Sequence, residues 1–466
     1  MAYSNLLGVR KAVSLMLLVS IFVAACGTVP TLPPAEITPT EVSTPTPVEP
    51  AVPPTEEPTA TPAEPTPSPA DTAYGVKVIA SEVERVTDPD VGAADIETWA
   101  EGHNDFAFRL YQAIREDEVN LFFSPYSIAV ALGMTYAGAR GETAAQMAEV
   151  LGFRLPQERL HPTMNAVALN LMAQEALTLT VANSLWAQED YAFLDVFLDT
   201  LARNYGAGVN IVDYIDPGAR EEARLAINAW VEDETQGKIE DLITEGMLTH
   251  LTRLVLANAI YFKGDWAQPF LDGTSDDTFT LLDGSSVTVP MMSRRAGTPH
   301  VDRGDYQAVA LPYTGERMQM VVLVPTSGRF AEVESQLDAR FARDVIEELT
   351  RSDVKLYMPR FTFDANLDLG GTLEAMGMPD AFDSGQADFS GMDGTTLLHI
   401  SDVAHKAFVA VDEEGTEAAA ATGVVVGIES LPVEVRVDRP FIFFIYDTEL
   451  DLFIFVGRVL DPTPVE

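Results

Sequence analysis

Apolar side chains recur every three or four residues in the first half of the chain, which is the spacing of one helix face. The helices that this spacing predicts are 97–115, 127–151 and 221–235. Ser124-Pro125 suits the beginning of the second helix, because proline is favoured in the first helical turn. Gly237 suits the end of the third helix.

Alternating or continuous apolar positions predict strands, and short ones dominate from Thr278 onward. The predicted strands are 177–187, 251–262, 318–324, 354–358, 440–446 and 452–459. The first two have the near-continuous apolar character of central strands. Helices in the first part of a chain and strands in the second indicate an α+β fold with large antiparallel sheets.

One segment suits neither a helix nor a strand well. Ala418 to Ala421 favour a helix, whereas Val424 to Val426 favour a strand. In a strand, alternate residues share a face, and the residues on one face would be Thr416, Ala418, Ala420, Thr422 and Val424. Most of these are small and none is charged, while Glu417 would point to the opposite face. We interpret the segment as a loop that can enter a packed sheet as an additional strand.

This segment resembles the inhibitory hinge of the serpins, the family of suicide-substrate protease inhibitors. The residues that carry the resemblance are Glu413, Gly415, Thr416, Glu417, Ala418, Ala419 and Ala420, and the strand 435–445 is similar to the family signature. Further similar blocks follow in family order: 120–128, 228–239, 256–266, 388–391 and 405–412. The resemblance covers about residues 95 to 463. On the hinge alone, an alanine-rich surface loop before an ordinary strand is the alternative.

The resemblance implies a serpin-like α+β fold with three β-sheets, eight or nine helices and an exposed reactive-centre loop between residues 415 and 435. It also implies that the chain inhibits extracellular serine proteases, or alternatively cysteine proteases, by inserting the cleaved loop into the main sheet and trapping the acyl-enzyme. Thr416 and Ala418 are uncharged, which favours an inhibitory member, because a buried charge would oppose insertion. A non-inhibitory serpin that acts as a binding or carrier protein is the alternative.

Two family spacings agree on the bond that a target protease would cleave. Counting 14 residues on from Gly415 or 11 back from Pro440 reaches Glu429. We therefore expect cleavage at Glu429–Ser430 by a protease that prefers glutamate. Bonds 426–427, for an elastase-like enzyme, and 428–429, for a subtilisin- or chymotrypsin-like one, are alternatives. No lysine or arginine occurs between residues 413 and 436, which disfavours a trypsin-like target.

Six further residues receive a role from the resemblance. Ser124, Ser127, Asn258 and His405 would form the shutter, a buried polar cluster beneath the point where the main sheet opens. Trp266 would lie at the breach, the end of the sheet where insertion begins, and Arg360 would pair there with Glu413. The alternatives are an ordinary buried histidine at 405 and a surface ion pair worth less than about 1 kcal/mol.

The chain begins with an export signal. Arg10 and Lys11 precede an apolar run that ends in Val23-Ala-Ala-Cys26. Residues 1–25 resemble a bacterial lipoprotein signal, which implies lipidation of Cys26, the only cysteine; plain secretion is the alternative. Residues 26–94 are rich in proline, threonine and glutamate and are predicted to be a disordered tether, followed by the serpin domain at 95–466.

The formal net charge is −42. Such a surface repels nucleic acid and favours basic partners, although solubility alone is an equal explanation. The chain has no H-E-x-x-H, G-x-S-x-G or phosphate-binding glycine loop, so we expect no enzyme activity, cofactor or metal. We expect a monomer at the outer face of a bacterial membrane, in contact with it only through the lipid anchor, or secreted.

Overall fold

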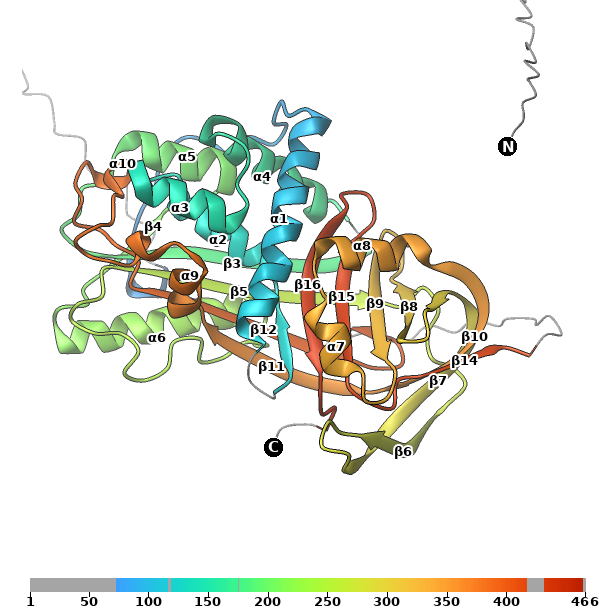
Figure 1. The fold of residues 1–466 in the computed structure, drawn as a ribbon. Helices are drawn as coiled ribbons and strands as arrows, with labels where there is room; N and C mark the ends of the chain where they lie inside the picture. The colour runs from blue at the N-terminus through green and yellow to red at the C-terminus, as the bar shows by residue number, and fades with distance from the viewer. Residues whose placement is uncertain (1–72, 116–118, 175, 417–430, 464–466) are drawn as a thin grey trace, which may run out of the picture. The chain divides into compact units, whose positions relative to one another are not determined.

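The computed structural model describes residues 73–115, 119–174, 176–416 and 431–463 (Figure 1). Its α-helices are α1 (Ala93–Ile114), α2 (Pro125–Tyr136), α3 (Gly141–Leu151), α4 (Gln157–Met172), α5 (Asp195–Tyr205), α6 (Pro217–Glu234), α7 (Phe330–Ser335), α8 (Ala339–Glu348), α9 (Gly370–Met376) and α10 (Ser390–Asp393). Short 3-10 turns lie at Ala73–Gly75 and Pro379–Ala381.

The first sheet has the strand order β1 (Lys77–Ile79), β4 (Val209–Val212), β3 (Leu177–Gln188), β5 (Leu254–Asp265), β13 (Gly415–Thr416), β12 (Asp402–Val411) and β11 (Phe361–Asp368). Figure 1 shows α2 to α5 on one face of this sheet and α6 on the other. Because both faces are covered, β5 is almost wholly buried, which explains its nearly continuous apolar sequence.

The second sheet has the order β14 (Val433–Arg436), β10 (Thr350–Pro359), β7 (Ser286–Asp302), β8 (Tyr306–Pro312), β9 (Met318–Pro325), β15 (Phe441–Asp447), β16 (Leu452–Val459) and β2 (Leu121–Phe123). A further strand, β6 (Thr274–Thr280), pairs with β7. The paired strands β15 and β16 are buried throughout.

The α+β fold class is confirmed, but two counts differ from the expectation. The described residues form two sheets rather than three, because the 17-residue strand β7 pairs with β6, β10 and β8 along its length and so joins what would be separate sheets. They form ten α-helices rather than eight or nine, and two of these, α7 and α10, have only six and four residues.

The single helix predicted at 127–151 is wrong. The structure ends α2 at Tyr136 and begins α3 at Gly141, whose φ of 54° is costly for residues other than glycine. A Cβ at Gly138 would lie 2.1 Å from the Cγ of Met392. The turn is therefore fixed by close packing against a segment about 250 residues away, which helix periodicity does not reveal.

The predicted boundary at residue 95 also differs from the structure. Lys77–Ile79 forms the edge strand β1, which pairs with β4. Farther along, the backbone N–H of Val86 donates to the carbonyl of Arg203 at 2.9 Å. The segment that precedes α1 is thus attached to the domain, and the alternation of Tyr74, Val76 and Val78 is a strand signal that the prediction did not use.

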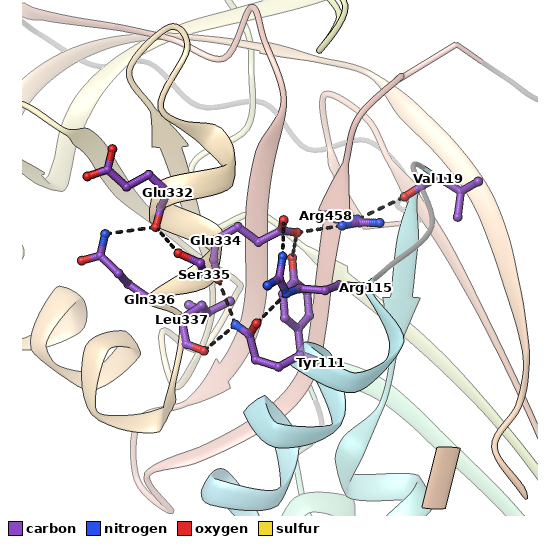
Figure 2. Close-up of polar contacts among 10 residues, drawn as sticks. Tyr111, Arg115, Val119, Glu332, Glu334, Ser335, Gln336, Leu337 and Arg458 are labelled. Carbon is purple, nitrogen blue, oxygen red and sulfur yellow. Dashed lines mark hydrogen bonds and ion pairs between the residues drawn. The ribbon is translucent and has the colours of Figure 1, made fainter. Parts of the chain in front are cut away.

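A buried carboxylate connects three elements that are distant in sequence (Figure 2). Glu334, at the end of α7, accepts hydrogen bonds from Tyr111 of α1 at 2.7 Å and from Arg458 of β16 at 2.8 Å. Arg115 adds an ion pair at 3.2 Å. Both Glu334 and Arg458 are only 4% exposed, so this cluster holds α1 and α7 against the second sheet from within.

Candidate functional site

The hinge has already entered the first sheet. Gly415 and Thr416 form the two-residue strand β13, which pairs antiparallel with Asp265 and Gly264 of β5. Thr416 also pairs with Val411 of β12. Beyond this point β5 and β12 pair directly with each other in parallel, over residues 255–260 and 402–407. The hinge therefore occupies one end of a slot whose remaining length is closed.

The side chain of Thr416 points into the protein. It is 1% exposed, and its hydroxyl shares a hydrogen bond of 2.8 Å with the hydroxyl of Tyr313. The Tyr313 ring stacks on Trp266 with a centroid separation of 4.6 Å. Burial raises the pKa of Tyr313, so its hydroxyl stays neutral. A small hydroxyl side chain fits this position, where a charged one would lose its hydration.

Trp266 fixes the turn before the hinge. Its indole N–H donates to the carbonyl of Asp412 at 3.0 Å, and its backbone N–H donates to the carbonyl of Glu414 at 2.8 Å. The Asp412 carboxylate accepts from the backbone N–H groups of Glu414 and Gly415 at 2.9 and 3.1 Å. Trp266 thus lies at the end of the sheet where the hinge enters, the place that the resemblance gave it.

Glu413 and Arg360 are brought together as the resemblance implied. The guanidinium of Arg360 donates to both carboxylate oxygens of Glu413, at 2.6 and 2.7 Å, and the Thr274 hydroxyl donates to the same carboxylate. Partial burial acts to raise the pKa of Glu413, but the hydrogen bonds from Thr274 and Arg360 outweigh it and hold that pKa below its ordinary value. Because Arg360 is about half exposed, we expect the pair to contribute less than about 1 kcal/mol.

A buried polar cluster lies farther along the slot and contains all four predicted shutter residues. His405 of β12 and Asn258 of β5 are direct cross-strand neighbours, and the imidazole Nδ1 hydrogen-bonds the Asn258 side-chain oxygen. The Asn258 amide donates to the hydroxyl of Ser127. The Ser124 hydroxyl donates to the carbonyl of Ile454 at 2.7 Å, so the cluster joins both sheets to the beginning of α2.

The contacts of His405 define its tautomer. Its Nε2 accepts from the backbone N–H of Ser124 at 3.2 Å, so the ring proton lies on Nδ1 and is donated to Asn258. Complete burial lowers the pKa of His405 to about 3. The imidazole is therefore neutral at physiological pH, and the bond between β5 and β12 at this point is a neutral one.

Sequence reasoning missed Asn183 and Tyr313. Asn183 of β3 accepts from the Asn258 amide and from the Ser127 hydroxyl, the latter at 3.4 Å. Tyr313 follows β8 and bonds the hinge directly. Asn183 does not stand out in the sequence, because the same strand also contains Thr178, Thr180 and Ser184. No local pattern marks Tyr313 either.

Several predicted residues lie outside the described part of the chain: Cys26, Glu417, Ala418, Ala419, Ala420, Glu429 and Ser430. Within the described ranges, no three or more histidine, cysteine, aspartate or glutamate side chains gather as a metal site would require. A search of the same ranges finds no helix with the length and apolar character needed to cross a membrane.

Comparison with known proteins agrees with this geometry. The family model described as Serpin (serine protease inhibitor) matches residues 101–462. An uncharacterized serpin-like protein of Thermococcus kodakarensis is 38% identical over 367 residues, which cover 77% of this chain and 84% of the relative. The leukocyte elastase inhibitor of Xenopus tropicalis is 37% identical over 372 residues, covering 77% of this chain and 97% of the relative.

Among solved structures, human thyroxine-binding globulin superposes with a TM-score of 0.73 at 31% sequence identity. The match covers 79% of this chain and all of the globulin chain. The same fold therefore occurs in relatives whose names point to protease inhibition and to ligand carriage.

Proposed function

The chain belongs to the serpin family, and from this premise we propose that it is a suicide-substrate inhibitor of extracellular serine proteases. The observation that carries the proposal is the position of Thr416, which is buried between β5 and β12 and hydrogen-bonded to Tyr313. The residues that follow it are small and uncharged at alternate positions. Insertion would thus continue a strand that has already begun.

In the proposed mechanism, a protease attacks the loop and forms an acyl-enzyme, and the severed loop extends β13 along the slot. A strand from Thr416 to about Ile428 spans roughly 40 Å at about 3.3 Å per residue. The attached protease would move across the molecule by a similar distance before it could hydrolyse the ester. Distortion of its catalytic site would then leave the acyl-enzyme trapped, with strain released by loop insertion as the driving force.

Insertion requires the direct pairing of β5 and β12 to break. Six residue pairs join the two strands, from Asp402–Val255 to Ala407–Ile260. His405 and Asn258 lie within this stretch, so their hydrogen bond would have to open as the new strand passes. The shutter cluster therefore acts in our proposal as the gate of the slot.

For the target we propose a protease that cleaves Glu429–Ser430, with an elastase- or subtilisin-like enzyme as the next candidate. The support is the agreement of two spacings in the sequence. Similarity to leukocyte elastase inhibitors favours the elastase-like alternative. A trypsin-like enzyme is disfavoured by the lack of lysine and arginine between residues 413 and 436.

The test is to incubate the protein with glutamyl-specific, elastase-like, subtilisin-like and trypsin-like proteases and to look for an adduct that survives boiling in detergent. We expect an adduct with the glutamyl-specific enzyme and a released C-terminal peptide that begins at Ser430. A different first residue would change the proposed target class. Cleavage by every active protease without an adduct would contradict inhibition.

The second candidate is a non-inhibitory carrier, which similarity to thyroxine-binding globulin favours. A carrier does not need to insert its loop before the acyl-enzyme is hydrolysed. It would therefore be cleaved by proteases as an ordinary substrate, and the same gel separates the two functions.

We further propose that the domain is exported and anchored through a lipid on Cys26, with the proline-rich residues as a tether. The support is the basic and apolar signal that ends at the only cysteine of the chain. Membrane fractionation of the Cys26→Ser variant tests this proposal, because the variant should be released from the membrane. If it stays with the membrane as fully as the unchanged chain, the lipid anchor is wrong.

A further inference from the structure

The end of the first sheet that lies farthest from the hinge exposes several aliphatic side chains. At this end β3 and β4 stop side by side, and β5 and β12 begin. The segments that follow or precede these strand ends each present one aliphatic side chain that is 57–66% exposed: Val196, Ile215, Leu251 and Leu397. Single exposed aliphatic residues are common on protein surfaces, but a group of them at one end of a sheet indicates an interaction surface.

Leu251 and Leu397 precede β5 and β12, the two strands that insertion would separate, and turns with internal hydrogen bonds hold both leucines. The Thr249 hydroxyl accepts from the N–H of Leu251 at 3.2 Å, and the Thr252 hydroxyl accepts from the N–H of Thr249 at 3.0 Å. The Thr395 hydroxyl accepts from the N–H of Leu397 at 3.3 Å. Side chains presented by turns that are fixed in this way lose little further freedom on binding, which favours affinity.

The same segments are acidic. Residues 189–196, 213–216, 249–253 and 393–401 contain six aspartates or glutamates and a single arginine, Arg253. The guanidinium of this arginine donates to the backbone carbonyls of two neighbouring residues. A surface with exposed leucines and an excess of carboxylates repels nucleic acid and anionic lipid, and it fits a protein partner that presents apolar and basic side chains.

The proposed mechanism would bring one particular protein to this end of the sheet. Thr416 is paired with Gly264 of β5. Continuing this register would place Val426 opposite Leu254, where β5 begins. Glu429, which would carry the acyl-enzyme, follows three residues later, or roughly 10 Å beyond the strand at about 3.3 Å per residue. The attached protease would therefore meet the turns that precede β5 and β12.

We propose that this end of the first sheet is a docking surface for the displaced protease, centred on Leu251 and Leu397. The two leucines pack against apolar side chains of the protease, and the neighbouring carboxylates face its basic side chains. This contact holds the protease in its distorted state and slows hydrolysis of the acyl-enzyme. The inference rests on the proposed function, and it adds that the lifetime of the adduct depends on this surface as well as on the inserted strand.

The experiment measures how long the detergent-stable adduct lasts. The adduct is purified from free protease, and the return of protease activity is followed with a peptide substrate. For the double variant Leu251→Asp, Leu397→Asp we expect adduct to form at the same rate and yield but to release active protease at least about tenfold faster, which corresponds to about 1.4 kcal/mol. Met172→Asp is the control, because Met172 is 65% exposed and precedes the end of β3 that pairs near the hinge; it should leave the release unchanged.

An adduct of unchanged lifetime in the double variant would overturn the docking surface alone, whereas the lack of an adduct with any protease would remove the proposed function and this inference with it. Hydrogen exchange provides a second test that needs no substitution. Exchange in residues 249–253 and 393–401 should be slower in the adduct than in loop-cleaved protein without protease, and equal exchange would overturn the proposal. A dimer of the intact chain that the two substitutions abolish would assign the surface to a second copy instead.

Discussion

The hinge depends on the size and charge of the side chain at residue 416. Thr416 faces the interior and shares a hydrogen bond with Tyr313. We predict that Thr416→Arg turns the inhibitor into a substrate, because a guanidinium buried there without a carboxylate would cost several kcal/mol and slow insertion. The measurement is the ratio of detergent-stable adduct to cleaved inhibitor at equal protease concentration, which should fall by at least about tenfold, as each 1.4 kcal/mol represents one factor of ten.

The matched control is Glu414→Arg, which introduces the same side chain two residues earlier. Glu414 is only partly buried and contributes backbone contacts to the turn. This variant should keep most of the adduct. If Thr416→Arg forms adduct as well as the unchanged protein, insertion beginning at residue 416 is not required for inhibition.

Three buried histidines predict a loss of stability in acid. Burial lowers the pKa of His103 and His161 to about 4 and that of His405 to about 3, from an ordinary 6.5. Below pH 6.5 the unfolded chain therefore binds protons that the folded chain does not. The stabilisation from the neutral rings is complete above pH 6.5 and is lost as pH falls toward 4 and 3.

Urea midpoints measured by tryptophan fluorescence between pH 7.5 and 4 should therefore decrease with pH. His405→Gln should flatten the decrease, since each histidine contributes up to about 1.4 kcal/mol per pH unit. His250 is exposed, so His250→Gln should leave the curve unchanged. An identical acid decrease in His405→Gln would show that this ring does not contribute.

At the residue scale, the structure brings together residues that were singled out by motif and not by periodicity. Trp266, Arg360 and His405 occupy places that the family resemblance implied, because motif residues keep their neighbours when the fold is kept. Tyr313 could not be found in this way. Its contact with Thr416 arises only when the loop after β8 meets the end of β5, a long-range juxtaposition that no local pattern encodes.

At the element scale, the Glu334 cluster is a buried polar connection between two helices and the second sheet (Figure 2). We predict that Glu334→Ala destabilises the protein by about 3–5 kcal/mol, because it removes a buried carboxylate that accepts hydrogen bonds from Tyr111 and Arg458. The loss should be visible as a lower urea midpoint. Glu332→Ala is the control: Glu332 lies on the same helix and pairs with Arg329 at the surface, so its removal should cost less than about 1 kcal/mol.

Strands were predicted more accurately than the connections between them. The prediction 452–459 matches β16, and 318–324 matches β9 within one residue. Such strands are apolar because they are covered on both sides, so their sequence alone indicates that they are buried. The break between α2 and α3 is instead set by Met392, and the length of β7 by the strands that pair with it. Those causes lie outside the segments themselves.

For the molecule as a whole, the proposed mechanism requires the first sheet to gain a strand. β5 and β12 are direct neighbours over six residue pairs and are separated by β13 only at one end. An inserted strand would replace one set of ladder hydrogen bonds with two. It would also place Ala418 and Ala420 in the interior, where small side chains need little space. In the proposed mechanism this change requires cleavage, because the intact loop is joined to β13 at one end and to β14 at the other.

Cleavage of the loop should therefore raise the melting temperature. We expect a net gain of about 5 kcal/mol, because each ladder hydrogen bond contributes about 0.5–1.5 kcal/mol and the inserted strand forms several of them at once. In a domain of this size such a gain would raise the melting temperature by roughly 10 °C. Differential scanning calorimetry of intact and loop-cleaved protein measures the difference. Cleaved Thr416→Arg provides the internal comparison, since its hinge resists burial and its gain should be smaller. If both cleaved forms melt with their intact parents, the slot between β5 and β12 does not accept the loop, and inhibition by insertion is excluded for this chain.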